Sequence, residues 1–439
     1  MRIAIIGAGI AGVTTAYECA AEGHQVTVFE RCGSVGAEGS FANGGLTAPG
    51  LSLAWNPAAW PGLGGAAKLT WDWQRWPAGR DKRRGELQQR LLKLALFSSA
   101  RQAELRRSLQ LDYERADGTL VLLRSEQDLN AAQASLDLLV QDGLSAHVLT
   151  AEQCLRVEPG LNPAMRLHAG IHLSQGENGN CRQFAHLLRS AAQRMGVEFR
   201  FHTTVRHLVP GTPARLVHEY TPPPDSLSEP SRQSEARNLT ESNEDTRPAP
   251  VGSKEDAFDA IIICTGADAA ELLQTLKLKP ALTRLHGFSI TAPLRQLEAH
   301  PELGPKAAVL DQQRQISISR IGQRIRVAGG VAPGTASERA KKSTLAALHQ
   351  TLDDWFPGAM QSTSVQRWQG AQALAADGLP LLGASGREGV WLNLAQGSAT
   401  TLGWPLACGT ARVLAEQVTG RSPSSELPDI TGLDIGRCT

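Results

Sequence analysis

Three glycines and one glutamate near the start of the chain have the spacing of a nucleotide-phosphate site. Gly7, Gly9 and Gly12 form a G-x-G-x-x-G pattern, and Glu30 follows a second apolar run. In such a pattern the first glycine makes a tight turn, the second lets the backbone approach a pyrophosphate, and the third lets a helix pack closely on a strand. An acid at the position of Glu30 accepts hydrogen bonds from ribose hydroxyls and repels the 2′-phosphate of NADP. These residues predict a dinucleotide site.

The segments around these glycines read as the strand, helix and second strand that a dinucleotide site needs. Arg2–Ile6 and Gln25–Glu30 read as strands, and Ala11–Glu22 reads as a helix that ends at Gly23. Glycines punctuate many loops, so the pattern is specific only because a strand precedes it and a helix follows. The alternative is an ordinary βαβ turn without a ligand.

Later stretches could reach the same ligand. Residues 31–50 form a glycine-rich loop, too long for a simple turn, in which Asn43, Gly44 and Gly45 offer unobstructed backbone amides. Asp259–Ala267 reads as a buried strand that opens into a Thr-Gly pair, where glycine again permits close approach. Residues 396–402 lead into a helix that starts near residue 403, and its N-terminus could hold partial negative charge on a bound ring.

Composition excludes several other classes of function. The 439 residues carry 44 basic and 43 acidic side chains, so no overall field attracts nucleic acid or a membrane surface. The seven cysteines lack a C-x-x-C pair, and H-E-x-x-H, zinc and Walker A patterns are absent, so we expect no metal site and no disulfide frame. No apolar run has the length of a spanning helix. We therefore expect a cytoplasmic protein, with peripheral contact on the inner membrane face as the remaining option.

The other patterns predict two domains of mixed α and β structure. Alternating strands between residues 281 and 332 indicate an antiparallel sheet outside the nucleotide fold. Residues 51–76 hold five tryptophans, which favours either a flap over an apolar cavity or a set of packing anchors. Residues 210–256 are rich in Pro, Ser and Glu, so we expect a mobile surface insertion whose flanking strands, 214–218 and 258–264, pair in one sheet. Helices are expected over residues 85–109, 126–141, 151–158, 180–195 and 337–355.

Six motifs give the chain the order and spacing of a known family. GAGIAG, NGGLTAPG, DAIIICTGA, RIRVAGG, DGLPLLG and TLGWPLACG, together with Glu30, resemble the FAD-dependent D-amino acid oxidase superfamily and especially its dehydrogenase members. The resemblance runs from Met1 to about Pro423, apart from residues 210–256. It implies a Rossmann-like FAD-binding α/β domain and a second α+β substrate domain, whose antiparallel sheet roofs the flavin. Residues 1–80, 165–280 and 366–425 would form the discontinuous FAD-binding domain, and residues 81–164 and 281–365 the substrate domain.

The same resemblance implies the chemistry and the site. Hydride passes from the carbon that bears an amine to the flavin, the imine is hydrolysed to an oxo acid and ammonia, and a quinone or another oxidant accepts the electrons. The partners are thus a small-molecule amine or amino acid and an electron acceptor. Arg320, His286 and Gln396 are expected at the substrate, with Arg367 as a further cation. The residues expected to bind FAD are Gly7, Ala8, Gly9, Ile10, Ala11, Gly12, Glu30, Arg31, Asn43, Gly44, Gly45, Leu46, Val205, Thr265, Gly266, Gly397, Thr400, Thr401 and Leu402.

Two departures from the family pattern bear on the substrate. Relatives of the dehydrogenase type carry Arg-Pro after a W-x-G motif, where this chain reads Trp368-Gln369-Gly370-Ala371-Gln372-Ala373, and they carry Gly-His-Gly where this chain has Ala395-Gln396-Gly397. A guanidinium is the best partner for an amino-acid carboxylate. The sequence therefore leaves three alternatives: a D-amino acid, an amine or small amide without a free carboxylate, or an FAD-containing subunit without turnover.

Overall fold

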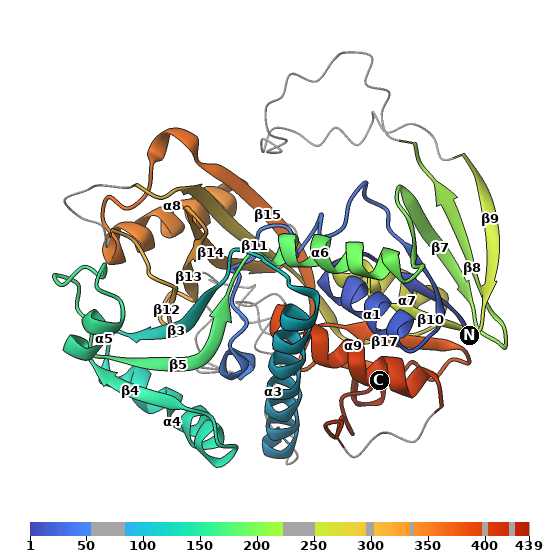
Figure 1. The fold of residues 1–439 in the computed structure, drawn as a ribbon, viewed down its shortest axis with the longest axis horizontal. Coiled ribbons are helices and arrows are strands. Elements are labelled where there is room, and N and C mark those ends of the chain that lie inside the picture. Colours follow the sequence, from blue (N-terminus) through green and yellow to red (C-terminus); the bar gives the residue numbers. More distant parts are fainter. Residues whose placement is uncertain are drawn as a thin grey trace.

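The computed structural model describes residues 1–53, 84–222, 251–295, 303–333, 338–396, 403–420 and 426–438. A six-stranded sheet, here called the nucleotide sheet, and an eight-stranded sheet, here called the roof sheet, form two halves of the molecule (Figure 1). The helix α3 (Arg84–Leu109) stands between them in this view, and a three-stranded sheet lies at the far side of the nucleotide sheet. The expected α/β fold class is confirmed.

The nucleotide sheet is built around β1 (Arg2–Ile6). β1 pairs in parallel with β2 (Gln25–Phe29) on one side and with β10 (Ala260–Ile263) on the other. Parallel strands end at the same sheet edge, so the Gly7 turn, Glu30 and Thr265 follow three neighbouring strands at one edge. The remaining strands are β6 (Glu198–Arg200), β17 (Val390–Leu394) and the antiparallel β16 (Leu381–Ala384).

Different elements cover the two faces of the nucleotide sheet. Ile3 and Ile5 pack toward a set of helices, whereas Ala4 and Ile6 pack toward α7 and the three-stranded sheet. All four side chains are buried, as the near-continuous apolar run of a central parallel strand requires. The helices of the first face are α1 (Ile10–Ala21), α3, α6 (Cys181–Arg194) and α9 (Trp404–Val418), and α7 is Ala269–Thr275.

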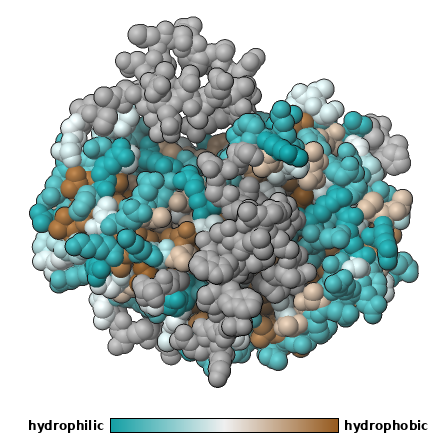
Figure 2. Space-filling model, turned by 180° about the vertical axis from the view of Figure 1, so that it is seen from behind, coloured by the Kyte–Doolittle hydropathy of each residue, from teal (hydrophilic) through white to brown (hydrophobic). Residues whose placement is uncertain are grey.

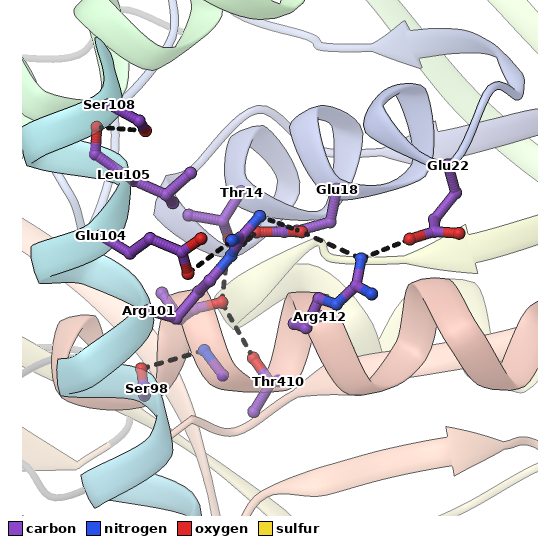
Figure 3. Close-up of polar contacts among 12 residues, drawn as sticks. Thr14, Glu18, Glu22, Ser98, Arg101, Glu104, Leu105, Ser108, Thr410 and Arg412 are labelled. Atoms are coloured by element: carbon purple, nitrogen blue, oxygen red, sulfur yellow. Dashed lines mark hydrogen bonds and ion pairs between the residues drawn. The ribbon is translucent and has the colours of Figure 1, made fainter. Parts of the chain in front are cut away.

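A buried ionic network joins three of these helices (Figure 3). Glu18 of α1 accepts two hydrogen bonds from Arg101 of α3, at 2.8 Å from Nε and 2.9 Å from Nη2. Arg412 of α9 lies 3.7 Å from the same carboxylate and also pairs with Glu22. Because the Glu18 side chain is only 1% exposed, its ion pairs with Arg101 and Arg412 fix how the three helices pack on the nucleotide sheet.

The three-stranded sheet includes both ends of the range that we expected to be a mobile insertion. Its order is β7 (Thr203–Val209), β8 (Ala214–Tyr220) and β9 (Val251–Phe258), so strands occupy both ends of the range 210–256. β8 pairs with β9, not with β10 as expected, because β10 already pairs with β1 and β17. The centre of the range, residues 223–250, lies outside the described residues, as does the tryptophan-rich stretch after residue 53.

The register of β8 and β9 makes a prediction about this range. Tyr220 is paired with Val251, so the two strand ends lie about 5 Å apart, and residues 221 and 222 can form a two-residue turn between them once residue 222 is joined to residue 251. We expect a chain that lacks residues 223–250 to bind FAD stoichiometrically and to melt within about 2 °C of the parent, since small surface changes cost little. Flavin content and thermal unfolding measure this, and loss of flavin would contradict it.

The roof sheet is mainly antiparallel and runs β15-β11-β14-β13-β12-β3-β5-β4. Its outer face carries apolar side chains such as Ile290, Ile318 and Val327, which pack on α8 (Glu338–Trp355). On the inner face, β11 and β13 carry the buried polar side chains of Ser289, Thr291, Ser317 and Ser319, whereas β3, β5 and β12 carry apolar side chains that pack with Leu46. The strands are β15 (Gln366–Ala375), β11 (Leu282–Pro293), β14 (Arg324–Pro333), β13 (Ile316–Ile321), β12 (Ala308–Asp311), β3 (Ala116–Leu123), β5 (Ala169–Asn178) and β4 (Ala146–Thr150).

Two strands of the roof sheet come from segments that the sequence pattern assigned to the FAD-binding domain. β5 and β15 lie within residues 165–280 and 366–425, yet β5 pairs with β3 and β15 pairs with β11. Long-range strand pairing overrides the order of segments along the chain. The expected helices are present as α3, α4 (Glu126–Gln141), α5 (Ala151–Val157), α6 and α8, and short 3-10 turns cover Pro49–Ser52, Gly266–Asp268, Ser362–Ser364 and Ile435–Cys438.

The outer surface is mainly hydrophilic where the described residues can be seen from behind, with apolar groups in small patches (Figure 2). Among the described residues, no helix combines the length and the hydrophobicity that crossing a bilayer requires. Within the same residues, no cluster of three or more His, Cys, Asp or Glu side chains could hold a metal ion.

Candidate cofactor and substrate site

Two of the three glycines are required by the chain's own packing. Gly7 has a φ of +100°, and a Cβ there would lie 2.7 Å from the carbonyl oxygen of Cys264. A Cβ on Gly12 would lie 1.8 Å from the carbonyl oxygen of Gly7. Real Cβ atoms do not approach so closely, so these two positions admit only glycine where β1, α1 and β10 meet.

Gly9 is different, because nothing in the described part of the chain requires a glycine there. Its φ is −67°, which any residue adopts, and a Cβ would meet only Ser40 Oγ at an ordinary 3.5 Å. Gly9 is also the N-cap of α1 and provides no side-chain cap. The helix thus begins beside an open space with free N–H groups nearby, which fits a phosphate group of FAD.

Glu30 lies buried beside this helix start. Its Oε2 accepts a hydrogen bond from the Ala8 N–H at 2.6 Å, and its Oε1 accepts one from the Cys32 N–H at 2.8 Å. Burial raises the pKa of Glu30, while these two backbone donors act in the opposite direction. A carboxylate has about four acceptor positions, so two remain for the ribose hydroxyls of FAD.

The neighbouring strand end offers a second contact. Within the described part of the chain, the buried Oγ1 atom of Thr265 has no hydrogen-bond partner, and Gly266 has a φ of +57° with open space where its Cβ would be. Arg31 is tied to Glu38 at 3.2 Å and to Asp268 at 2.7 Å, so its position beside this strand end is fixed. Val205 lies in β7, two residues after Thr203, whose N–H donates to the Glu30 carbonyl at 2.9 Å.

The loop of residues 39–47, here called the cofactor loop, runs from the nucleotide sheet under the inner face of the roof sheet. The Asn43 side chain is fully buried, its Oδ1 accepts from the Gly45 N–H at 3.2 Å, and its Nδ2 has no partner. The Gly44 carbonyl accepts from Ser319 Oγ at 2.8 Å, and Leu46 bridges to Asn178. The unpartnered Asn43 amide adds a free donor where the flavin is expected.

Gln396 is held in a buried polar cluster at the start of α9. Its Nε2 donates to Thr410 Oγ1 at 2.7 Å and to Asn393, whose own amide donates to Thr15 of α1 at 3.0 Å. The Oε1 atom of Gln396 has no hydrogen-bond partner among the described residues. Gly397, Thr400, Thr401 and Leu402 lie outside the described residues.

Taken together, the residues present fit FAD. The open space at Gly9, the spare acceptor positions of Glu30 and the unpartnered atoms of Thr265, Asn43 and Gln396 surround the edge of the nucleotide sheet. Buried polar atoms without partners are rare in folded proteins and call for a ligand or another explanation.

The inner face of the roof sheet forms the opposite wall. Trp368 of β15 stacks on Phe41 of the cofactor loop with ring centroids 6.5 Å apart, and its register partner is Ser289, whose buried Oγ has no partner. By strand alternation Gln372 shares this face. Its Nε2 is likewise buried without a partner, so a neutral amide donor stands where the family pattern has an arginine.

Three residues expected at the substrate lie on the other face. Arg320 is two residues after Ile318 and so lies on the same outer face, where it donates to the Gly322 carbonyl at 3.2 Å. Arg367 pairs in register with Ile290 and lines an open hollow beside α8. His286 contacts Gln369 at 3.2 Å, and both belong to the outer face by register. The structure therefore does not bring these three together with the inner-face residues, because one residue of register decides the face of a strand.

Sequence reasoning missed Arg326, a buried cation that does lie on the inner face. Its side chain donates from Nε to Thr291 Oγ1 at 3.0 Å and from Nη1 to the Asn43 carbonyl at 3.2 Å. The signal was present in RIRVAGG, where the second arginine alternates with isoleucine and valine and so faces away from α8.

Comparison with known proteins also indicates an FAD-dependent oxidoreductase. A family model described as FAD dependent oxidoreductase matches residues 2–417. The chain is 31% identical to a D-amino acid dehydrogenase from Cereibacter sphaeroides, covering 98% of this chain and 94% of that protein. It is 30% identical to a D-amino acid dehydrogenase from Rhizobium rhizogenes, covering 98% and 99%.

Solved structures show the same fold. Glycine oxidase from Geobacillus kaustophilus superposes with a TM-score of 0.70 at 20% identity, covering 99% of each chain. L-proline dehydrogenase from P. horikoshii superposes with a TM-score of 0.65 at 14% identity, covering 97% of this chain and 95% of that one. The chain belongs to the DAO family of FAD-dependent oxidoreductases, and FAD is its cofactor.

Proposed function

We propose that this oxidoreductase oxidises the C–N bond of a D-amino acid or a closely related amine. The observation that carries the proposal is the inner face of the roof sheet lying directly over the cofactor loop, fixed there by contacts of Ser319, Arg326 and Trp368. A substrate between that face and the flavin is enclosed on both sides. The similarity to D-amino acid dehydrogenases over nearly the whole chain supports the same class of substrate.

Bound FAD supplies the electron sink that accepts hydride from the carbon bearing the amine. The residues of this chain then need only to orient the substrate and exclude water. The stacked Phe41 and Trp368 rings form an apolar wall for this purpose, and Gln372 offers an N–H donor to an oxygen of the substrate.

Gln372 favours a second candidate substrate, an amine or amide without a free carboxylate. A hydrogen bond from a neutral amide is roughly half as strong as one from a guanidinium to a carboxylate. The test is steady-state oxidation of a D-amino acid, its amide and an N-alkylglycine, with the carbonyl product and the released ammonia or amine as readouts. Turnover of the first compound supports the primary proposal, turnover of the amide alone supports the second, and turnover of none contradicts both.

Replacing Gln372 should change the selectivity in a defined direction. We expect Gln372→Arg to raise kcat/KM for the D-amino acid relative to its amide by about tenfold, because a charged guanidinium replaces a single neutral N–H donor. Gln369→Arg is the matched control, since Gln369 is three residues away on the same strand, therefore on the outer face, and should leave the ratio unchanged. An unchanged ratio in the Gln372 variant would contradict the assignment of this position to the substrate.

We also propose a quinone, or another oxidant other than oxygen, as the electron acceptor. The support is that the similar proteins from Cereibacter sphaeroides and Rhizobium rhizogenes are named dehydrogenases and not oxidases. A quinone acceptor would bring the protein to the membrane surface as a peripheral partner. Comparing turnover with a short-chain quinone under nitrogen with turnover in air alone tests the acceptor, and equal rates in air without quinone would contradict it.

A further inference from the structure

One charge on the inner face of the roof sheet is not balanced within the described part of the protein. Arg326 is only 5% exposed, and its acceptors Thr291 Oγ1 and Asn43 O are both neutral. Arg324, two residues earlier on the same strand, pairs with Glu114 at 2.6 Å. The ion pairs formed among the described residues include none with Arg326.

A buried cation without a counter-ion destabilises a folded protein. Burial, followed by repulsion from Arg324, lowers the pKa of Arg326 to about 10. The guanidinium therefore stays charged at neutral pH, and the protein carries the cost of burying it. Such a group is explained when a ligand brings the missing negative charge.

The contacts of Arg326 lead to the cofactor and not to the substrate end of the sheet. Its acceptor Asn43 belongs to the cofactor loop, and Ser40 lies three residues earlier in the same loop. Ser40 Oγ in turn accepts from the Ile10 N–H at 3.0 Å, in the first turn of α1. The cation is thus connected, through the backbone of the cofactor loop, to the helix start where the phosphates of FAD are expected.

Strand register excludes the alternative that Arg326 replaces the arginine missing at Gln372. Gln372 pairs with Leu285 and Arg326 pairs with Thr291, and these partners are six residues apart on β11. Six residues of extended strand span about 20 Å, far more than an arginine side chain reaches. The two positions therefore serve different groups.

We propose that Arg326 provides the counter-charge for an anionic group of bound FAD and acts as a positioning residue through Asn43. Two groups of FAD carry suitable charge: the pyrophosphate, in both redox states, and the isoalloxazine, which gains negative charge when it is reduced. The proposal concerns the cofactor alone, so it stands or fails independently of the substrate proposed above.

The experiment compares Arg326→Met, Arg326→Gln and Arg326→Lys in the full chain. Gln keeps an N–H donor for Asn43 O without the charge, and Lys keeps the charge. Arg324→Met is the matched control, because it removes one charge from the same strand at a position that already has a carboxylate partner. The readouts are the dissociation constants of FAD and ADP from the apoprotein and the flavin reduction potential.

We expect the Met and Gln variants to change at least one readout tenfold and the Lys and Arg324 variants to stay within about threefold of the parent. Equal weakening of FAD and ADP identifies the pyrophosphate as the partner. Unchanged ADP binding with a tenfold smaller equilibrium constant for reduction, about 30 mV for two electrons, identifies the isoalloxazine.

Three results would overturn the proposal. The first is FAD and ADP binding within twofold of the parent, with an unchanged potential, in both neutral variants. The second is loss of FAD affinity in the Met variant alone, which would show that the hydrogen bond to Asn43 matters and the charge does not. The third is failure of both neutral variants to fold even with excess FAD while the Lys variant folds, which would place the role of the charge in the apoprotein.

Discussion

Gly12→Ala should unfold or severely destabilise the nucleotide-binding half of the protein. A Cβ at this position would lie 1.8 Å from the carbonyl oxygen of Gly7, and neither backbone can move away without breaking the junction of β1 and α1. Overpacking a core typically costs about 1–3 kcal/mol, and we expect more here because the clash is between backbone atoms. Thermal or urea unfolding of the apoprotein measures the loss.

Gly9→Ala is the control for this change and separates the fold from the cofactor. Its Cβ would meet only Ser40 Oγ at 3.5 Å, so the apoprotein should be as stable as the parent. FAD affinity should nevertheless fall at least about tenfold, and Gly9→Val should yield largely cofactor-free protein, because the side chain occupies the space of the pyrophosphate. Full, stoichiometric flavin in the Val variant would contradict the site.

Arg101→Met should cost about 3–5 kcal/mol of stability, because it leaves the Glu18 carboxylate buried without the two hydrogen bonds from the Arg101 guanidinium (Figure 3). Arg412, 3.7 Å away, is too distant to replace both hydrogen bonds. A double variant with Glu18→Gln should recover part of the lost stability, since it removes the negative charge of the buried carboxylate. A double-mutant cycle in urea measures this, and additive effects would contradict the coupling of the two residues.

The loss in Arg101→Met should also depend on pH. Burial raises the pKa of Glu18 even with Arg101 present, so the folded state holds this proton more tightly than the unfolded state does. The contribution of Glu18 to stability is therefore most favourable at acidic pH and falls as the pH rises above the ordinary carboxyl range. Without Arg101 this fall should be steeper, and equal pH profiles of variant and parent would contradict that expectation.

Local patterns were enough to predict most of the nucleotide-binding half. The G-x-G-x-x-G spacing, the buried run of β1 and the acid at position 30 each have a distinct physical task, and the structure places them at one sheet edge. The helix expected over residues 126–141 matches α4, where Ser125 and Asp128 form a capping box. These features depend on neighbours in sequence, so the sequence alone defines them.

Long-range pairing was harder to predict. β15 and β4 were not expected as strands, and β4 has an irregular burial pattern because it is an exposed edge strand. The substrate candidates Arg320 and His286 depended on which face each strand turns to α8. Usual patterning assigns apolar residues to the core and polar ones to solvent, but the polar inner face of the roof sheet is buried against the cofactor loop.

The most direct test of the account is anaerobic mixing of the FAD-loaded protein with the two enantiomers of an amino acid, followed through the visible absorption of oxidised flavin. We predict that the D-enantiomer, or its amide, bleaches the flavin in a single turnover and releases one carbonyl product per flavin, while the L-enantiomer does not. A flavin that stays oxidised with D-amino acids, their amides and N-alkylglycines alike, in protein that binds FAD stoichiometrically, would contradict the proposed amine oxidation.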